Sequence, residues 1–309
     1  MAGDEYLRLS HIKANLERRA LIFDVIRTFF RSEGFLEVET PLQVPTVAPE
    51  KYITPFNVNG WFLSTSPEMH MKRLLAAGCT KIFQICHCFR KSERGQLHNP
   101  EFTMLEWYRV GADYMQIIQD TEHLVLTLAS RLRLGTTVRY QGAEIDLVSP
   151  WPRITVREAF LDSAGWDPFE CLDEERFDVD LVEKVMPNFA ANRPTVLMDY
   201  PVAMASLSRI RPGNPPVAER AEAFMGGLEL ANAYSELTDA AEQERRFKQE
   251  IDSLALERGN NIAMPQMFLD AVARLPECGG IALGIDRLVM LFCDAASIDE
   301  VIAFPWDVV

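Results

Sequence analysis

Two strand-like segments separated by a polar loop carry the residues whose types and spacing are most suggestive of chemistry. Residues 81–90 (KIFQICHCFR) and 101–109 (EFTMLEWYR) alternate as strands, and the linker between them, KSERGQLHNP, holds one glycine and one proline. This pattern predicts an antiparallel hairpin with a long charged loop. Because side chains alternate along a strand, Phe102, Glu106 and Tyr108 share one face, where a ring, a carboxylate and a phenol meet.

Two of the basic side chains near the loop of this predicted hairpin are candidates for chemistry. Arg90 ends the first strand and His98 lies in the loop. A strand-end arginine beside a polar loop is suited to clamp a phosphate group. On alternation alone, a sheet with a salt bridge at its edge is the more economical interpretation.

A second predicted hairpin covers residues 222–237 and turns at Gly226-Gly227. With a two-residue turn, Glu222 lies diagonal to Glu229 on one face. Two carboxylates so placed repel each other unless a cation lies between them, and Mg²⁺ prefers oxygen ligands. Two solvated carboxylates explain the pattern equally well.

Three further polar residues follow on the second strand of that hairpin. Asn232, Tyr234 and Glu236 share a face, which on a regular strand is opposite to the face of Glu229. A site that uses all four residues therefore requires a bulge or twist near Ala231.

The third element is CGGIALGIDRLVMLF, which predicts a glycine-punctuated strand entering a helix near Ile285. It places Asp286 and Arg287 in the first helical turn, where the helix N-terminus and the arginine attract phosphate. The chain has no G-x-x-x-x-G-K-[ST] or G-x-G-x-x-G motif, and it has no G-x-S-x-G or H-E-x-x-H motif.

Composition restricts the classes of partner. The 309 residues are 48% hydrophobic and 25% charged, with 31 Lys+Arg against 45 Asp+Glu and a net charge of −14. Such an acidic chain is a poor general binder of polyanions. The sequence shows neither a bilayer-spanning apolar run nor a secretory pattern at MAGDEYLRLS, which favours a cytoplasmic protein without membrane partners.

The six cysteines are expected to be reduced thiols rather than a disulfide framework. Among the cysteines, Cys86-His87-Cys88 suggests a metal, but its spacing is not the usual C-x-x-C pair. Its apolar neighbours favour a strand instead.

The remaining elements set the fold class. Ser10 is expected to cap a helix over about residues 12–33, followed by the strand FLEVET, which Pro41 terminates. Helices are predicted over about 113–132 and in the charged stretch after residue 237, and residues 150–192 are mixed and mostly helical. The order lacks a βαβ rhythm, so the sequence predicts an α+β fold with a mostly antiparallel sheet flanked by helices.

Three segments, taken in chain order, resemble the three motifs of class II aminoacyl-tRNA synthetases, and most closely those of the lysyl subgroup. The carrying segments are FLEVETPLQVPT with the helix before it, FRKSERGQLHNPEFTMLEWY, and GGIALGIDRLVML. GGLELANAYSELTD resembles the segment that holds Mg²⁺ and the amino acid in that subgroup. The resemblance implies a class II catalytic core as one domain over residues 1–309, using ATP and Mg²⁺ and forming a homodimer through the first motif.

The family's roles carry over onto matching positions. The resemblance implies that Arg90 and Arg287 are catalytic. It implies ATP-binding residues at Arg90, Glu93, His98, Phe102 and Arg287, with the Phe102 ring on adenine. It implies metal ligands at Glu222 and Glu229, and lysine-binding residues at Glu68, Glu106, Tyr108, Asn232, Tyr234, Glu236 and Ala282.

The sequence departs from the lysyl-synthetase pattern in three places, and these departures restrict the activity expected of it. The first motif begins near residue 12, which leaves no room for an N-terminal anticodon-binding OB-fold. Ser92 stands where the family usually has glutamate, and Glu93 follows it. Ala233 and Ala282 stand where lysyl enzymes have glycine, and the added methyl at Ala282 is expected to reshape the amino-acid pocket.

The truncated pattern resembles the stand-alone lysyl-synthetase paralogues that join (R)-β-lysine to a lysine side chain of translation elongation factor P. On this resemblance, we expect an enzyme that activates lysine or (R)-β-lysine as an acyl-adenylate and transfers it to that factor. A core that charges tRNA is the first alternative, although the missing domain and the acidic balance weigh against it. An inactive synthetase-like binding module is the second.

Overall fold

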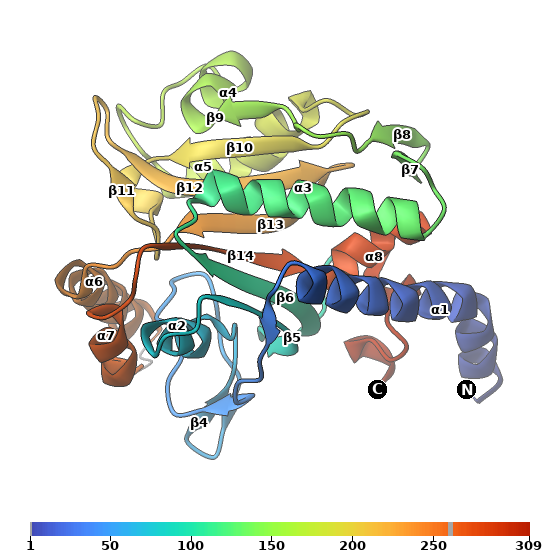
Figure 1. The fold of residues 1–309 in the computed structure, drawn as a ribbon, viewed down its shortest axis with the longest axis horizontal. Helices are drawn as coiled ribbons and strands as arrows, with labels where there is room; N and C mark the ends of the chain where they lie inside the picture. Colours follow the sequence, from blue (N-terminus) through green and yellow to red (C-terminus); the bar gives the residue numbers. More distant parts are fainter. Residues whose placement is uncertain (1, 259–261) are drawn as a thin grey trace. The chain divides into compact units, whose positions relative to one another are not determined.

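The computed structural model describes residues 2–258 and 262–309, and they fall into two compact units (Figure 1). The first unit comprises Met1–Val110, Thr238–Pro276 and Leu283–Val309, and the second comprises Gly111–Leu237 and Glu277–Ala282. None of the helices in the described ranges combines the length and the apolar composition that a bilayer-spanning segment needs.

The first unit is built around a hairpin and the helices that pack on it. Its helices are α1 (Ala2–Ser32), α2 (Glu68–Ala76), α6 (Ala240–Arg258), α7 (Gln266–Val272) and α8 (Ile285–Cys293). Its strands are β1 (Leu36–Glu37), β2 (Gln43–Val44), β3 (Asn57–Val58), β4 (Trp61–Leu63), β5 (Lys81–Phe89) and β6 (Glu101–Val110). β5 pairs antiparallel with β6 and parallel with β1, while β2, β4 and β3 form a small antiparallel sheet.

The second unit is a sheet with helices on both faces. Its helices are α3 (Tyr114–Arg131), α4 (Val156–Ser163) and α5 (Glu174–Asp180). Its strands are β7 (Thr137–Tyr140), β8 (Ala143–Asp146), β9 (Arg153–Thr155), β10 (Thr195–Tyr200), β11 (Ile210–Arg211), β12 (Val217–Met225) and β13 (Leu228–Ser235), and β14 (Cys278–Gly284) begins in this unit and ends in the first. β12 pairs antiparallel with β10, β11 and β13, whereas β9 pairs parallel with β10.

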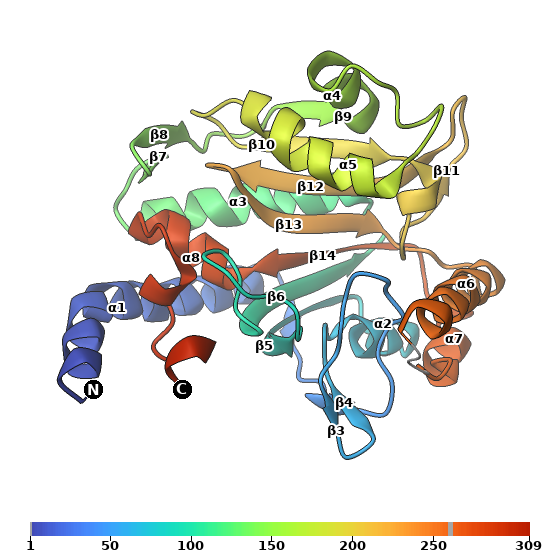
Figure 2. The same ribbon diagram turned by 180° about the vertical axis from the view of Figure 1, so that it is seen from behind.

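The two views of the second unit show α3 on one face of the β10–β12–β13 strands and α5 on the other (Figures 1 and 2). The predicted α+β class with mostly antiparallel pairing is therefore confirmed. The expected helices over about 113–132 and after residue 237 correspond to α3 and α6.

The first helix is longer than the sequence predicts. We expected it to begin after Ser10, but α1 starts at Ala2, so Ser10 is an exposed residue within the helix rather than its cap. A tertiary contact holds the added segment, because Arg8 donates to the Ala303 carbonyl. Two further side chains of α1 donate to distant backbone carbonyls, Asn15 to Glu300 at 3.0 Å and Arg18 to Phe292 at 2.7 Å.

Aromatic side chains form part of the core in each unit. In the first, Phe30 of α1 stacks on Phe83 of β5 with ring centroids 4.8 Å apart and lies 5.0 Å from Trp107 of β6. In the second, Phe160 of α4 stacks on Phe177 of α5 at 4.3 Å. All five rings are buried, and burying each stabilises the fold by about 2–3 kcal/mol.

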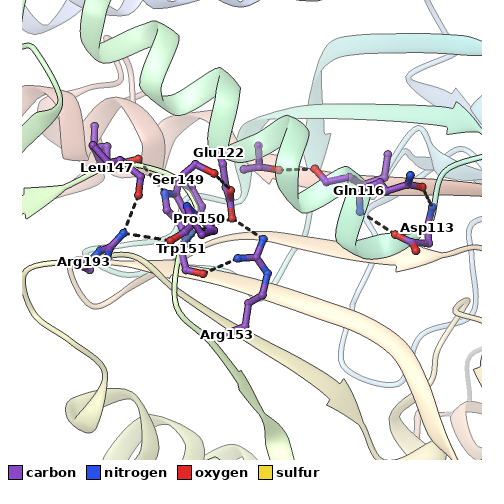
Figure 3. Close-up of polar contacts among 12 residues, drawn as sticks. Asp113, Gln116, Glu122, Leu147, Ser149, Pro150, Trp151, Arg153 and Arg193 are labelled. Carbon is purple, nitrogen blue, oxygen red and sulfur yellow. Dashed lines mark hydrogen bonds and ion pairs between the residues drawn. The ribbon is translucent and has the colours of Figure 1, made fainter.

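A buried carboxylate ties α3 to the segment that leads into β9 (Figure 3). The side chain of Glu122 is fully buried. It accepts hydrogen bonds from the Ser149 hydroxyl, from the Trp151 amide at 3.1 Å and from the Arg153 guanidinium at 2.8 Å. Because all three donors converge on one carboxylate, this glutamate fixes the chain between β8 and β9.

Glu122→Ala should therefore lower the free energy of unfolding by about 3 kcal/mol, because it leaves buried donors and a guanidinium without their acceptor. Chemical denaturation followed by far-ultraviolet circular dichroism measures the change. Glu17→Ala is the matched control, since Glu17 and Lys13 form an exposed pair with side chains 69% and 75% accessible, and it should cost under about 0.5 kcal/mol. Equal losses in the two variants would contradict the role assigned to Glu122.

Candidate active-site residues

The register of β5 and β6 decides which side chains of the first hairpin meet. Gln84 pairs with Glu106, Ile82 with Tyr108, and Cys88 with Phe102. The antiparallel pairing and the shared face of Phe102, Glu106 and Tyr108 are thus as the alternation predicts.

Arg90 follows the last residue of β5 and contacts several groups at once. Its guanidinium carbon lies 5.2 Å from the centroid of the Phe102 ring, and its Nη1 donates to Glu93 at 3.1 Å. Burial lowers the pKa of Arg90, but the carboxylates of Glu93 and Glu50 outweigh it and hold the pKa above its ordinary value. The side chain is therefore a fixed cation against an aromatic face, an arrangement that suits binding of an anion next to a ring.

Arg287 occupies the first turn of α8 and reaches the loop between β5 and β6. Its Nη2 lies 2.6 Å from Nε2 of His98, and its Nε donates to the Leu97 carbonyl at 3.4 Å. Burial and the neighbouring Arg287 charge lower the pKa of His98. The imidazole is therefore neutral at pH 7, and Nε2 accepts the hydrogen bond from Arg287.

Asp286 fixes the start of α8, a role that the sequence did not suggest. One carboxylate oxygen accepts from the Thr103 amide of β6 at 2.7 Å, and the other lies 2.6 Å from Nη1 of Arg19 on α1. This buried residue holds the helix that carries Arg287 against both β6 and α1.

Glu106 lies in a pocket of hydroxyl groups. The residue is 1% exposed, and its two oxygens accept from Ser66 at 2.6 Å and from Tyr108 at 2.9 Å. Burial and the nearby charge of Glu68 raise the pKa of Glu106 to about 8. At neutral pH its carboxyl is therefore mostly protonated, and an incoming cation would convert it to the carboxylate.

Glu68 begins α2 next to this pocket. Its amide donates to the Ser66 hydroxyl at 3.0 Å, and its carboxylate lies 2.5 Å from Nζ of Lys72, which is 2% exposed. Sequence reasoning missed both Ser66 and Lys72. The four-residue spacing of Glu68 and Lys72 on a helix was the available signal for the ion pair.

The second unit contains the other predicted hairpin. Gly226 and Gly227 form its turn with φ of 59° and 79°, values that a type I′ turn requires. Phe224 pairs with Glu229, as a two-residue turn predicts.

A bulge follows this turn. Ala223 pairs with Ala231 directly after the Phe224–Glu229 pair, so Leu230 is the extra residue on β13. The bulge predicted near Ala231 is therefore confirmed. It brings to one face of β12 and β13 the residues Glu222, Glu229, Asn232 and Tyr234.

Glu222 is the most buried carboxylate on that face. It lies 2.5 Å from Nη2 of Arg220, and Nδ2 of Asn232 donates to it at 3.4 Å. Burial and the charge of Glu229 raise the pKa of Glu222, whereas Arg220 opposes the rise. Two carboxylates that repel each other beside an amide are a donor set that fits an oxygen-preferring divalent cation.

Arg220 is another residue that sequence reasoning missed. Its guanidinium carbon lies 4.4 Å from the Tyr200 ring centroid and 5.9 Å from that of Tyr234. Of the remaining expected residues, Glu236 is buried and its amide donates to the Cys278 carbonyl at 2.9 Å, and Ala282 is half-buried in β14.

The side chains of Cys86, His87 and Cys88 do not converge as the ligands of a histidine–cysteine metal site would. His87 is exposed and its Nδ1 lies 2.9 Å from Glu101, on the face of β5 opposite to the two cysteines. In the ranges that the structure describes, no group of three or more His, Cys, Asp or Glu side chains is placed to hold a metal ion.

Comparison with known proteins identifies the family. The family model described as tRNA synthetases class II (D, K and N) matches residues 5–308. The chain belongs to this family.

Curated relatives of this class II synthetase chain carry a more specific name. Proteins named elongation factor P–(R)-β-lysine ligase from Salmonella gallinarum (strain 287/91 / NCTC 13346), Salmonella paratyphi A (strain ATCC 9150 / SARB42) and Salmonella heidelberg (strain SL476) are each 40% identical to it. Each match covers 95% of both chains. The resemblance to class II synthetases is thereby confirmed.

One departure from the class II pattern now has a structural description. Ser92, at the position where a glutamate is usual, is exposed, whereas Glu93 is half-buried and paired with Arg90. The carboxylate paired with Arg90 is thus supplied one position later.

Replacing the buried Glu106 carboxyl should change how stability depends on pH. The unfolded chain ionises near the ordinary pKa of 4.5, whereas the folded chain keeps the proton up to about pH 8. The free energy of unfolding therefore falls as pH rises through this window, by up to about 1.4 kcal/mol per pH unit. Glu106→Gln should remove that part of the slope.

Urea denaturation of both proteins at several pH values across the window measures the difference. Glu17→Gln is the control, because its side chain is 69% exposed and its partner is a lysine rather than a histidine, and it should leave the slope unchanged. A Glu106→Gln slope equal to that of the wild type would disprove protonation of the buried carboxyl.

Proposed function

We propose that this chain activates lysine or (R)-β-lysine with ATP as an acyl-adenylate and ligates it to a lysine side chain of translation elongation factor P. The observation that carries the proposal is the 40% identity, over 95% of both chains, to relatives named for that reaction. The basic and carboxyl groups of the first unit support it, because they suit a triphosphate and a diamino acid.

In the first step, the substrate carboxylate attacks the α-phosphate of ATP and pyrophosphate leaves. Arg90 would neutralise the charge that develops on the α-phosphate, with Phe102 beneath its guanidinium offering a face for adenine. Arg287 would bind the outer phosphates, with neutral His98 holding its guanidinium. Such groups act mainly by positioning and by charge neutralisation, which is what phosphoryl-type transition states require.

The diamino acid would be recognised by the pocket around Glu106. Its distal ammonium would take the place of the proton on Glu106, next to Tyr108, and its other amino group would lie at Glu68. In the second unit, Asn232 would orient the carboxylate, and Tyr234, Glu236 and Ala282 would line the amino-acid pocket.

Glu222 and Glu229 would hold Mg²⁺, and Glu93 would complete the nucleotide contacts near Arg90. When bound, the ion would supply positive charge to the phosphates. The chain's own contribution is a pair of oxygen donors on one face, which the bulge at Leu230 brings together.

In the second step, the acceptor amine attacks the acyl carbon, the new amide bond forms and AMP leaves. The amine attacks in its neutral form, and its nitrogen loses one proton to solvent as the amide bond forms. The step therefore requires no nucleophilic side chain. A homodimer through α1 and β1 completes the proposal, and tRNA is not expected to be an acceptor.

The decisive experiment is mass spectrometry of purified elongation factor P after incubation with the protein, ATP, Mg²⁺ and either (R)-β-lysine or lysine. The proposal predicts a mass increase of one lysyl group on the factor. Parallel incubation with tRNA tests the alternative acceptor. Charging of tRNA without modification of the factor would replace the proposal, and no adenylate formation with either amino acid would favour a binding module.

Substitution of either active-site arginine should suppress activation. Arg90→Ala and Arg287→Ala should each lower amino-acid-dependent ATP–pyrophosphate exchange by about 10²–10³-fold, because each removes a group that neutralises phosphate charge. Arg245→Ala is the matched control, since Arg245 is exposed on α6 and pairs with Glu242. Retention of more than a tenth of the exchange rate by both variants would refute these roles.

The methyl group of Ala282 is expected to influence the choice of isomer. Ala282→Gly should shift the ratio of kcat/KM values for (R)-β-lysine and lysine toward lysine by about tenfold, because one methylene-sized change in a pocket is worth about 1–3 kcal/mol. Exchange kinetics with both isomers provide the ratio. An unchanged ratio would show that Ala282 does not determine the preference between the two isomers.

A further inference from the structure

Three sulfur atoms lie together on one face of the β5–β6 hairpin. Cys86 and Cys88 are two residues apart on β5, so their side chains point the same way, and their Sγ atoms are 3.9 Å apart. Sγ of Cys88 is also 3.9 Å from Sδ of Met104. Met104 pairs directly with Cys86 across the hairpin, so all three sulfurs belong to one cluster.

Little of this cluster is open to solvent. Cys88 is 0% exposed and Met104 is 5% exposed, and His87 points to the opposite face, where it pairs with Glu101. Cys86 is half-buried, so a small ion can enter from its side. Glu106 and Arg90 are the charged groups that act on the Cys88 thiol, and the donors in contact with its sulfur are those of Cys86 and Met104.

The spacing of the sulfurs suits a three-coordinate ion. A metal–sulfur bond of about 2.3 Å places the ligands of a trigonal site about 4.0 Å apart. The Cys86–Cys88 and Cys88–Met104 sulfur separations of 3.9 Å are close to this value. Two thiolates and a thioether are soft ligands, which select Cu⁺ and similar thiophilic ions over Mg²⁺ or Ca²⁺.

We propose that Cys86, Cys88 and Met104 form a binding site for one soft monovalent metal ion of the Cu⁺ or Ag⁺ class. Two S–H bonds break as two metal–thiolate bonds form, the two protons pass to solvent, and the thioether adds a third bond without changing any oxidation state. Because binding releases two protons, it should strengthen as pH rises.

This site borders the residues assigned to the nucleotide but does not depend on that assignment. Cys88 pairs across the hairpin with Phe102, whose ring carries the Arg90 guanidinium. A bound ion would therefore lie beside groups that are expected to receive phosphate, and it should inhibit adenylate formation.

The test is anaerobic titration of the full-length, thiol-reduced protein with Cu⁺ supplied as its coloured bicinchoninate complex. The wild type should withdraw one Cu⁺ per chain from the chelator. Cys86→Ser and Cys88→Ser should each weaken binding by at least about 100-fold and Met104→Leu by about tenfold. Cys171→Ser, which alters an exposed thiol, should bind like the wild type.

X-ray absorption at the copper edge gives a readout independent of catalysis, and three sulfurs at about 2.3 Å are expected. A wild-type protein that withdraws no Cu⁺, equal affinity in Cys86→Ser, loss of binding in Cys171→Ser, or two-sulfur linear coordination would each overturn the proposal. If Cys88→Ser fails to fold, Cys86→Ser at the half-buried position still decides the outcome. Failure of the site would leave modification of elongation factor P unaffected.

Discussion

The antiparallel register of β5 and β6 is the constraint on which the chemistry of the first unit depends. It sets Phe102 under Arg90 and places Glu106 and Tyr108 on the same face. A slip of one residue would turn all these side chains to the opposite face. Asp286 also stabilises this arrangement. Its carboxylate accepts a hydrogen bond from the Thr103 amide of β6 and so holds the helix that carries Arg287 in place.

The two buried ionisable groups Arg90 and Glu106 have opposite environments on that hairpin. Around Arg90, carboxylates keep a cation charged in a place that burial would otherwise disfavour. Around Glu106, two hydroxyl groups bond the carboxyl while burial keeps it protonated. The first environment suits an anionic ligand and the second a cationic one, which is in line with the nucleotide and the amine that the proposal assigns to them.

The sequence predicted the features that depend on strand alternation and turn chemistry. The β5–β6 hairpin, the Gly226-Gly227 turn and the bulge near Ala231 follow from local patterns, and the structure confirms them. It could not predict contacts between residues far apart in the chain, such as Arg19 with Asp286. The early start of α1 was missed for the same reason, because Arg8 in the added segment donates to the distant Ala303 carbonyl. Arg220 was missed because a charged residue inside a fold gives no pattern of its own, whereas the signal for Lys72, its four-residue spacing from Glu68, was present but not used.

The way α1 is held has a consequence for the order of folding. Its side chains donate to the carbonyls of Phe292, Glu300 and Ala303, which lie 274 to 295 residues further along the chain. Synthesis proceeds from the N-terminus, so α1 is made long before these acceptors exist. Its docking by these bonds therefore has to follow synthesis of residues 292–303.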